Sequence, residues 1–350
     1  MTTTLCERRI WAYPEGSMTR ALAVLTLVAG LAVLVHAPAG SRGATPSHVE
    51  VRNAALLHVA GGRLWWVGTT CRPTRYALAS GRLTVSARRY CLIWPSPDGT
   101  QTLASGTAAA FPAPPGRVAV LSGASLGTVA LTPIREDHIV APAVWSSDSK
   151  LALVCDAGRS GPVATLDLVE RPWRQARPLS HRCTPAFAGN AVLSSSTRGN
   201  VYDNKQRYHI NRALSAGVGR QLSVTAMAFS QGHLAVAVAS RSRSQIVVID
   251  TTIGEVQRFR TTGPVREIAV SPDGSELWYK LPAGDQRVLL PLDGRVQLGD
   301  VPGKAAAYAW SPDGRFIAAA QNDSVQIFDR HTGRSATIDT GAVTTLAWTA

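Results

Sequence analysis

Short apolar runs and turn-forming residues alternate along most of the chain. In Val325–Phe328, apolar and polar side chains take turns along the run, which is the pattern of a strand with one buried face. The tetrapeptide Ser-Pro-Asp-Gly separates such runs at Ser96–Gly99, Ser271–Gly274 and Ser311–Gly314. Proline presets a turn angle, and Asp and Gly accept turn geometries. Each copy therefore predicts a tight turn between two strands.

The turns recur at intervals of roughly 40 residues. Degenerate copies follow further apolar runs, and they lie at Ala60–Gly62, Ser146–Ser149, Ala188–Asn190 and Ser230–Gly232. A second turn, such as Asp329–Gly333, follows the better copies and adds another strand pair. Four strands in a unit of this length indicate a propeller blade. We predict an all-β propeller of seven blades with four antiparallel strands each, or of six blades if the first or fourth unit is incomplete.

The two ends of the repeat array depart from the pattern. In the first unit, Leu57–Val59 is expected to form the strand before the turn at Ala60–Gly62. At the other end, Val343–Trp348 matches the strand that precedes a first turn. We expect this last strand to join the first blade and close the ring, because closure protects edge strands that otherwise template aggregation.

The units resemble the repeats of the TolB-like, WD-type β-propeller family. That pattern is an aromatic residue, Ser-Pro-Asp-Gly, a basic or polar residue and then small apolar residues. Trp310–Ala318 carries it fully, and Val270–Trp278 and Trp94–Leu103 carry most of it. The resemblance covers roughly Val51–Ala350 and implies a propeller fold. Relatives include exported scaffolds and domains that gate peptidases, but the sequence holds no hydrolase domain, so peptidase activity is not expected.

The N-terminal part predicts export. Arg8, Arg9 and Arg20 precede an uncharged apolar run, Ala21–Val35, and small residues follow it. A basic segment, an apolar segment and a small-residue site are typical of a secretory signal, and an uncleaved membrane anchor is the alternative. We divide the chain into a short extension at 1–17, a signal or anchor at 18–40, a linker at 41–50 and a propeller at 51–350. The extension reflects an open choice between Met1 and Met18 as the start.

Four cysteines follow the apolar run, which suggests disulfides in an exported protein. Cys71 comes after the second strand of unit one, and Cys91 begins the first strand of unit two. Cys155 and Cys183 occupy the same phases of units three and four. The repeat phase therefore predicts the pairs Cys71–Cys91 and Cys155–Cys183, each joining adjacent blades. Free buried thiols are the alternative.

The formal net charge of +13 comes almost entirely from arginine. Such a charge attracts anionic partners, but the arginines are spread along the chain and form no long run. We therefore interpret the charge first as a compositional bias toward arginine. We expect a protein partner first and an anionic envelope polymer or membrane surface second. Nucleic acid is not expected as a partner, and nothing in the sequence indicates an oligomer.

Candidate catalytic and metal-binding motifs are weak. Gly123–Gly127 matches G-x-S-x-G, but strand-like runs flank it on both sides, so we predict a hairpin turn rather than a nucleophile elbow. Glu136–His138 is a compact polar trio in a loop without a second ligand pair nearby. Five histidines lie in different units without shared spacing, and they are His58, His181, His209, His233 and His331. We predict no catalytic residue, no metal site and no cofactor.

The chain has nine tryptophans. Four occupy the repeat position before a first turn and are expected to pack between blades, and these are Trp94, Trp145, Trp310 and Trp348. Trp173, with Arg171 and Arg174 beside it, falls in a loop and is the best candidate for a contact with a partner.

These features favour an exported β-propeller that binds or scaffolds proteins in the cell envelope or outside it. The expected location is periplasmic, extracellular or tethered to a membrane and facing outward. The first alternative is a propeller enzyme of the lyase, glycosidase or cofactor-dependent dehydrogenase type with its site at the central channel. The second is a charge-driven binder of anionic polymers or membranes, which would lose affinity steeply with salt.

Overall fold

The computed structural model describes residues 49–106, 117–135, 143–155, 163–167, 186–188, 191–195, 201–203, 206–207, 223–241, 243–282, 286–292 and 301–350. The chain divides into two units, Met1–Ala44 and Thr45–Ala350. Every described element belongs to the second unit. The expected signal or anchor segment at 18–40 lies outside the described residues.

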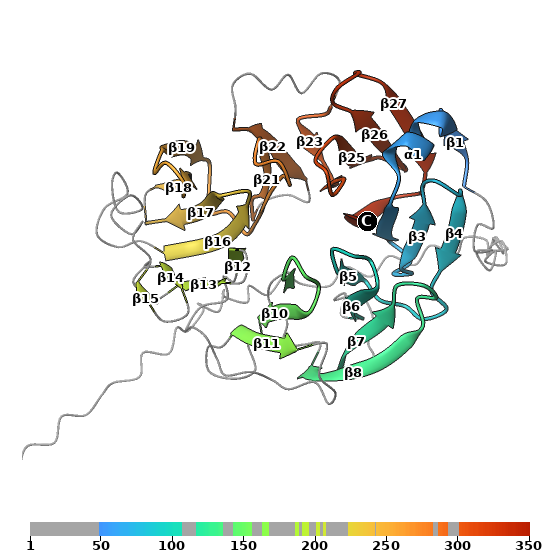
Figure 1. Ribbon diagram of the computed structural model, residues 1–350, viewed down its shortest axis with the longest axis horizontal. Helices are drawn as coiled ribbons and strands as arrows, with labels where there is room; N and C mark the ends of the chain where they lie inside the picture. The colour runs from blue at the N-terminus through green and yellow to red at the C-terminus, as the bar shows by residue number, and fades with distance from the viewer. Residues whose placement is uncertain are drawn as a thin grey trace, which may run out of the picture. The chain divides into compact units, whose positions relative to one another are not determined.

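The described strands form seven antiparallel sheets, which we number in chain order (Figure 1). Sheet 1 contains, in order, β28 (Val343–Thr349), β2 (Arg63–Gly68), β3 (Thr74–Ala77) and β4 (Arg82–Val85). Sheet 2 contains β5 (Leu92–Pro95), β6 (Gln101–Ser105), β7 (Arg117–Ser122) and β8 (Thr128–Arg135). Sheet 3 contains β9 (Val144–Trp145), β10 (Leu151–Cys155) and β11 (Val163–Asp167).

The remaining sheets follow the same order. Sheet 4 contains β12 (Ala186–Ala188), β13 (Ala191–Ser195), β14 (Val201–Asp203) and β15 (Gln206–Arg207). Sheet 5 contains β16 (Ser223–Ser230), β17 (His233–Ala239), β18 (Ser244–Asp250) and β19 (Val256–Thr261). Sheet 6 contains β20 (Glu267–Val270), β21 (Glu276–Lys280), β22 (Arg287–Pro291) and β23 (Lys304–Ala305). Sheet 7 contains β24 (Ala307–Trp310), β25 (Phe316–Gln321), β26 (Ser324–Asp329), β27 (Ser335–Asp339) and β1 (Val51–Arg52).

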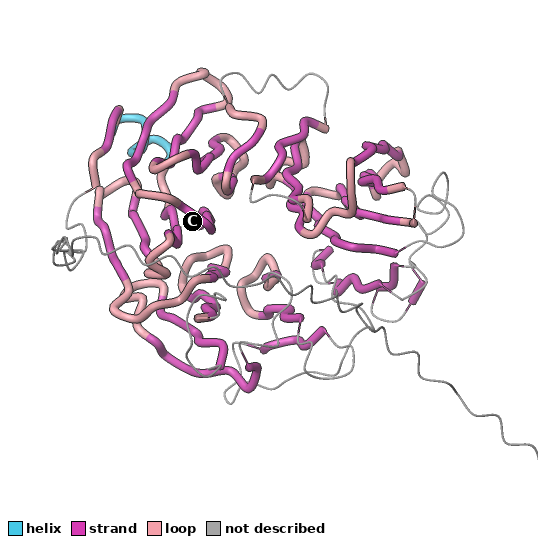
Figure 2. The backbone as a smooth tube through the Cα atoms, turned by 180° about the vertical axis from the view of Figure 1, so that it is seen from behind, coloured by secondary structure: helices cyan, strands magenta, loops and turns pink. Residues whose placement is uncertain are grey.

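Within Thr45–Ala350 the sheets follow one another around a ring (Figure 1). The strand given first for each sheet above lies nearest the centre, so β28 is the inner strand of sheet 1. Seen from behind, strands and their turns make up nearly all of the described chain (Figure 2). The all-β prediction is therefore confirmed, and the arrangement is that of a β-propeller. Among the described residues, no helix is long and apolar enough to cross a membrane.

The first turn of each good repeat is held by one buried serine. The Ser311 hydroxyl donates to Asp313 Oδ1 and accepts the Phe316 N–H at 2.9 Å, while the Gly314 N–H donates to the Ser311 carbonyl. The same bonds form around Ser96 and Ser271, whose side chains are equally buried. A hydroxyl and a carboxylate thus replace backbone partners that a four-residue turn lacks.

The weakened copy at Ser146–Ser149 folds in the same way. Ser146 donates to Asp148 Oδ1 and accepts the Leu151 N–H. Ser149 takes the place of the glycine with a positive φ of 60°. The repeat therefore tolerates loss of its proline and glycine, whereas the serine and aspartate are kept.

The ring is closed by both ends of the described chain. β28 pairs with β2 from Arg63↔Thr349 to Gly68↔Val343, with a register shift between Val67 and Gly68. The last strand therefore joins the first sheet, as predicted, and it takes the inner position there. β1 adds a strand to the outer side of sheet 7 by pairing with β27. Each end of the repeat array is therefore fastened to the other end by backbone hydrogen bonds.

The predicted strand at Leu57–Val59 is wrong. These residues lie in α1 (Ala54–Ala60), a helix that buries Leu56 and Leu57. Since β28 occupies the inner position of sheet 1, the first unit needs no inner strand of its own. The apolar residues instead cover the cluster between sheets 7 and 1, with Phe316 and Ile338.

The core lies in the seams between neighbouring sheets. One apolar cluster joins sheets 7 and 1 and includes Leu64, Trp66 and Ile327. Others join sheets 5 and 6, and sheets 6 and 7. A sheet in this arrangement is stabilised by the two sheets beside it, which makes the array cooperative along its length.

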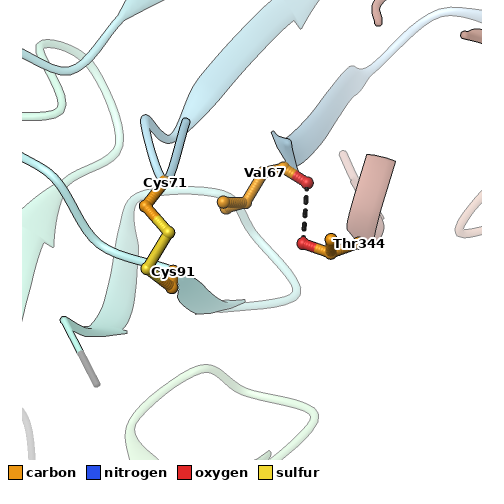
Figure 3. The surroundings of a disulfide bond; sticks show 4 residues. All are labelled: Val67, Cys71, Cys91 and Thr344. Atoms are coloured by element: carbon orange, nitrogen blue, oxygen red, sulfur yellow. Dashed lines mark hydrogen bonds between the residues drawn. A yellow bond between two sulfur atoms is a disulfide. The ribbon is translucent and has the colours of Figure 1, made fainter. Parts of the chain in front are cut away.

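Cys71 and Cys91 lie at disulfide distance, with their sulfur atoms 1.91 Å apart, and they join sheet 1 to the start of sheet 2 (Figure 3). The Tyr90 N–H donates to the Cys71 carbonyl across the same connection. This is the first of the two pairings predicted from the repeat phase. Cys183 of the second predicted pair, Cys155–Cys183, lies outside the described residues.

Candidate binding channel

The inner strands of the seven sheets surround a cavity of about 630 Å³. Each sheet contributes through its inner strand or the residues beside it. Most of the lining side chains are apolar or aromatic, and these include Val144, Phe187, Met227, Phe229, Ile268 and Val270. A concave site of this size and polarity is typical of ligand or partner binding.

The rim of this cavity is built from the second position of the Ser-Pro-Asp-Gly turn. Pro97, Pro272 and Pro312 all line the cavity, and Ser147 does so from the same position of the weakened copy. Pro97, Ser147 and Pro312 are exposed. Proline in these turns therefore presents a rigid apolar ring at the channel mouth as well as setting the turn angle. We call this end of the ring the turn face.

Tryptophans before the turns form the wall below the rim. Trp145, Trp310 and Trp348 line the cavity, together with Trp278 from the second strand of sheet 6. Packing between blades was predicted for the first three, and Trp310 and Trp348 are buried in the seams as expected. Their contribution to the channel was not predicted, because the sequence does not show that the first strand of each unit lies innermost.

The indole N–H groups of the three tryptophans before the turns, Trp145, Trp310 and Trp348, are already bonded. Trp145 donates to the Trp94 carbonyl at 2.8 Å, and Trp310 donates to Glu276 Oε2 at 3.0 Å in the preceding sheet. Trp348 donates to the Gly61 carbonyl at 3.3 Å. The rings therefore offer the channel carbon surface and no spare donor.

The other end of the channel is charged. A second cavity, of about 410 Å³, is lined by Trp94, Trp278 and Tyr308, and it also contains Glu267 and Arg287. The two cavities share five residues, which are Pro95, Ala143, Trp145, Glu267 and Trp278. They are therefore two parts of one space, apolar at the turn face and ionised at the opposite end.

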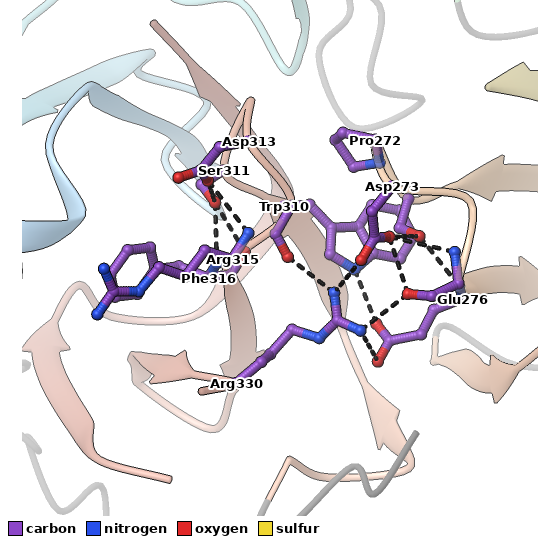
Figure 4. A network of polar contacts seen from close by, with 12 residues as sticks. Pro272, Asp273, Glu276, Trp310, Ser311, Asp313, Arg315, Phe316 and Arg330 are labelled. Carbon is purple, nitrogen blue, oxygen red and sulfur yellow. Dashed lines mark hydrogen bonds and ion pairs between the residues drawn. The ribbon is translucent and has the colours of Figure 1, made fainter. Parts of the chain in front are cut away.

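Arg330 of sheet 7 contacts two carboxylates of sheet 6 next to the rim (Figure 4). Its guanidinium lies 2.7 Å from Asp273 Oδ2 and 3.3 Å from Glu276 Oε1, and it donates to the Gly314 carbonyl at 2.7 Å. Asp273 follows the rim residue Pro272, so this contact fixes the turn of sheet 6 against sheet 7. Charged hydrogen bonds of this kind are stronger than neutral ones.

The two carboxylates that Arg330 contacts differ in environment. Burial alone would raise the pKa of Asp273, but hydrogen bonds from Ser271, Arg330 and Ser275 lower it from 3.8 to about 2. Burial raises the pKa of Glu276, against the opposing effects of the Trp310 hydrogen bond and the Arg330 charge. Glu276 is 1% exposed, so its charge depends on these partners.

The described residues contain no group of three or more His, Cys, Asp and Glu side chains that could hold a metal ion. Gly123–Gly127 connects β7 to β8 as a hairpin turn, so the helix that a nucleophile elbow requires does not follow it. His58 lies in α1, His233 begins β17 and His331 follows β26. The polar trio Glu136–His138 and the other two histidines, His181 and His209, lie outside the described residues.

The contact residues predicted from the sequence also lie outside the described part. Trp173, Arg171 and Arg174 fall between β11 and β12, where no residue is described. Reasoning from the sequence missed the rim prolines and Trp278. A usable signal existed for the prolines, since the three copies of one tetrapeptide place the same ring at the same point of three blades.

No family profile matches the chain, and no curated protein matches it either. Several solved structures align with it at low identity. The Cps50 (Swd1) β-propeller domain of Myceliophteria thermophila is 14% identical over 73% of this chain and 87% of its own, with a TM-score of 0.46. TolB from Acinetobacter baumannii is 12% identical over 82% of this chain and 66% of its own, with a TM-score of 0.45. Apo AztD from Citrobacter koseri is 10% identical over 82% of this chain and 98% of its own, with a TM-score of 0.48.

Proposed function

We propose that this chain is an exported, seven-bladed β-propeller that binds a protein partner on the turn face, at the rim of its central channel. Apolar and aromatic groups concentrated at one end of a rigid ring are typical of a docking surface. The supporting observation is the rim itself: Pro97, Ser147, Pro272 and Pro312 surround an opening whose wall carries Trp145, Trp310 and Trp348.

A binding role fits this lining better than catalysis. The rim presents rigid rings without spare donors, whereas a general acid or base needs a positioned titratable group. An aspartate follows each rim residue, and all four accept a hydrogen bond from the serine of their own turn: Asp98, Asp148, Asp273 and Asp313. Arg330 also engages Asp273 and Glu276 and holds one blade against the next.

Export is proposed on two grounds. The basic and apolar segments before residue 41 have the order of a secretory signal, and the Cys71–Cys91 pair lies at disulfide distance. Disulfides persist in oxidising compartments. We propose the second bridge, Cys155–Cys183, as part of the same adaptation. Mapping of non-reduced proteolytic peptides from the exported protein tests it, and N-terminal sequencing of that protein shows whether the signal is cut.

Site-specific cross-linking tests the docking face. A photoreactive amino acid replaces Pro312 in the full chain, in cells that export it. The matched control is Asn322, an exposed residue at the opposite end of β25 in the same sheet. We expect one discrete cross-linked product from Pro312 and none from Asn322. Equal products from both positions, or none from Pro312, would refute docking on the turn face.

Two further arms refine the result. Repeating the cross-linking at high salt separates apolar docking from charge-driven binding, because only the latter weakens strongly as ions screen it. A photoreactive group at Trp173 tests the contact proposed for that residue and its neighbours Arg171 and Arg174. Cross-linking from Trp173 to the same partner would extend the docking surface beyond the rim.

A further inference from the structure

The charged end of the channel combines a hydrocarbon-lined space with an excess of positive charge. The smaller cavity is walled by Ile93, Trp94, Trp278 and Leu346, among other apolar side chains. It continues into the larger one through five shared residues. Together they offer a continuous, mainly apolar space of the size that small-molecule sites have.

Three strands of sheet 6 bring their charged residues to one level. The register places Glu267 opposite Lys280, and Lys280 opposite Arg287. Arg287 Nη2 lies 3.0 Å from Glu267 Oε2, and Lys280 Nζ lies 3.9 Å from Glu267 Oε1. A single carboxylate is thus shared by two cations, which leaves a positive charge at this end of the channel.

Arg266 adds a further cation beside this group. It precedes Glu267, lines the larger cavity and is exposed. Within the described part of the chain, its guanidinium makes no hydrogen bond or ion pair. Among the described residues, Arg266, Lys280 and Arg287 stand against Glu267, so this group has three positive charges and one negative charge, an excess of two. An anionic group at this mouth would gain a favourable interaction with that excess.

Arg287 also connects the charges to the apolar wall. Its guanidinium lies 5.0 Å from the centroid of the Trp278 ring, and it donates to the Ala306 carbonyl. The cation–π contact and the ion pair with Glu267 hold Trp278 as a fixed surface where the charged end meets the apolar space. The site is therefore built before any ligand enters.

We propose that this half of the channel binds a single-chain anionic amphiphile, with its carboxylate or phosphate head at Arg266 and its hydrocarbon chain along Trp278 and Trp145. A sugar is disfavoured because its hydroxyl groups need polar partners, whereas most of the side chains that line the smaller cavity are apolar or aromatic. A cation is disfavoured because it meets an excess of positive charge. This site goes beyond the docking of a protein on the turn face and uses the opposite end of the channel.

Quenching of tryptophan fluorescence tests the site. The probe is 9,10-dibromostearate below its micelle concentration, added to the full exported protein, with unbrominated stearate as the reference. We expect saturable quenching, because bromine atoms along the chain contact the channel tryptophans. Replacement of Trp278 by Phe removes part of the quenchable emission, whereas Trp66→Phe, in the seam between sheets 7 and 1, leaves the quenched part unchanged. Absence of saturable quenching overturns the proposal.

Charge reversal tests the head-group position. Arg266→Glu is expected to weaken binding of the probe about tenfold, the effect of losing one charge-assisted contact. Arg334→Glu, an exposed arginine in the turn before β27 that makes the same change in net charge, is the matched control and should bind as the native protein does. Equal affinities of the two variants refute the anionic head site.

Competition identifies the head group. Stearate displaces the probe if the site accepts a carboxylate, and stearoyl lysophosphatidate displaces it if the site accepts a phosphate. The better competitor identifies the class of head group. Methyl stearate keeps the chain but lacks the charge, so it should compete poorly. If methyl stearate competes as well as stearate, the binding is apolar only and the proposal is wrong.

Discussion

Arg330 shows how one side chain joins two blades. Its partner Glu276 is 1% exposed, so removing the guanidinium leaves a buried carboxylate whose one remaining donor, within the described ranges, is the Trp310 N–H. We expect Arg330→Leu to lower the free energy of unfolding by about 3–5 kcal/mol, as happens when one partner of a buried ion pair is removed. Denaturation by urea, followed by circular dichroism, measures the change.

The matched control is Arg334→Leu, since Arg334 is an exposed arginine of the same sheet. It should change the free energy of unfolding by less than about 0.5 kcal/mol. Adding Glu276→Gln to Arg330→Leu removes the unpaired charge and should restore more than half of the loss. If Arg330→Leu is no more destabilising than Arg334→Leu, the contact between the blades has no energetic role.

The lowered pKa of Asp329 predicts that the protein is less stable in acid. Hydrogen bonds from Arg315 lower the pKa of Asp329 from 3.8 to about 2, against the effect of burial, and its side chain is 1% exposed. Because the native carboxylate is the weaker base, the unfolded state takes up the proton first. The stabilisation is therefore complete above pH 4 and is lost as the pH falls toward 2.

A shift of this size corresponds to roughly 2 kcal/mol. We expect Asp329→Asn to lose about that much at pH 6 and to show a smaller further loss than the native protein between pH 4 and 2. Asp323→Asn, at an exposed position in the turn before β26, controls for the removal of a charge. Asp273 titrates in the same direction in all three proteins. Parallel pH profiles for native protein and Asp329→Asn would contradict this account.

At the scale of elements, the glycine of a first turn allows the neighbouring sheet to approach closely. Gly99 of sheet 2 has a φ of +66°, and a Cβ there would lie 2.5 Å from the Thr349 hydroxyl in sheet 1. A Cβ on Gly314 of sheet 7 would lie 3.1 Å from Asp273 in sheet 6. Where serine replaces glycine at Ser149, its hydroxyl accepts the Asp98 N–H from the preceding sheet. The position therefore serves both the turn and the seam.

Two glycine substitutions separate these effects. Gly333 has a φ of +69° but open space around it, so Gly333→Ala should cost only the backbone strain, about 1 kcal/mol. Gly99→Ala adds the clash with Thr349 and should cost about 3 kcal/mol. Thermal and urea unfolding of both variants measure the difference. Equal costs would show that sheets 1 and 2 adjust freely at this seam.

The same elements explain what the sequence reveals. A serine, a proline and an aspartate at fixed spacing determine a turn through local bonds, so Ser96–Gly99 and its copies were predictable. The apolar run Leu57–Val59 has no such local determinant, and a short apolar run fits a helix or a strand equally. Its conformation depends on β28, which takes the inner position from almost 300 residues away. Only the closed ring shows this.

For the whole molecule, the ring places functional groups that the sequence separates. Trp145, Trp278 and Trp348 come from different units and meet in one channel. The repeat predicted that two of them pack between blades, since that follows from nearest neighbours alone. The channel depends on which strand of each unit lies at the centre, and the charged group depends on the pairing of β20, β21 and β22. Both are properties of the assembled ring.

Ring closure should make unfolding cooperative. Leu346 of β28 is 8% exposed and packs in the cluster between sheets 7 and 1, whereas Thr344 of the same strand is exposed. Leu346→Asp places a charge among the apolar side chains of that seam and should lower the free energy of unfolding by more than about 3 kcal/mol. Thr344→Asp keeps the strand and adds the same charge at the surface, but it loses the hydrogen bond that the Thr344 hydroxyl donates to the Val67 carbonyl, so it should cost about 1 kcal/mol.

The form of the transition is the decisive observation. If β28 couples the first and last sheets, Leu346→Asp shifts a single transition to lower urea, and tryptophan fluorescence and circular dichroism change together. If the sheets fold as a loose array, local damage to sheet 1 spreads little, and the two signals separate into distinct transitions. If β28 only covered the edge of sheet 1 without coupling it to sheet 7, the two signals would separate into distinct transitions. Because β28 supplies the inner strand of sheet 1 and contacts the channel through Trp348, we expect the first.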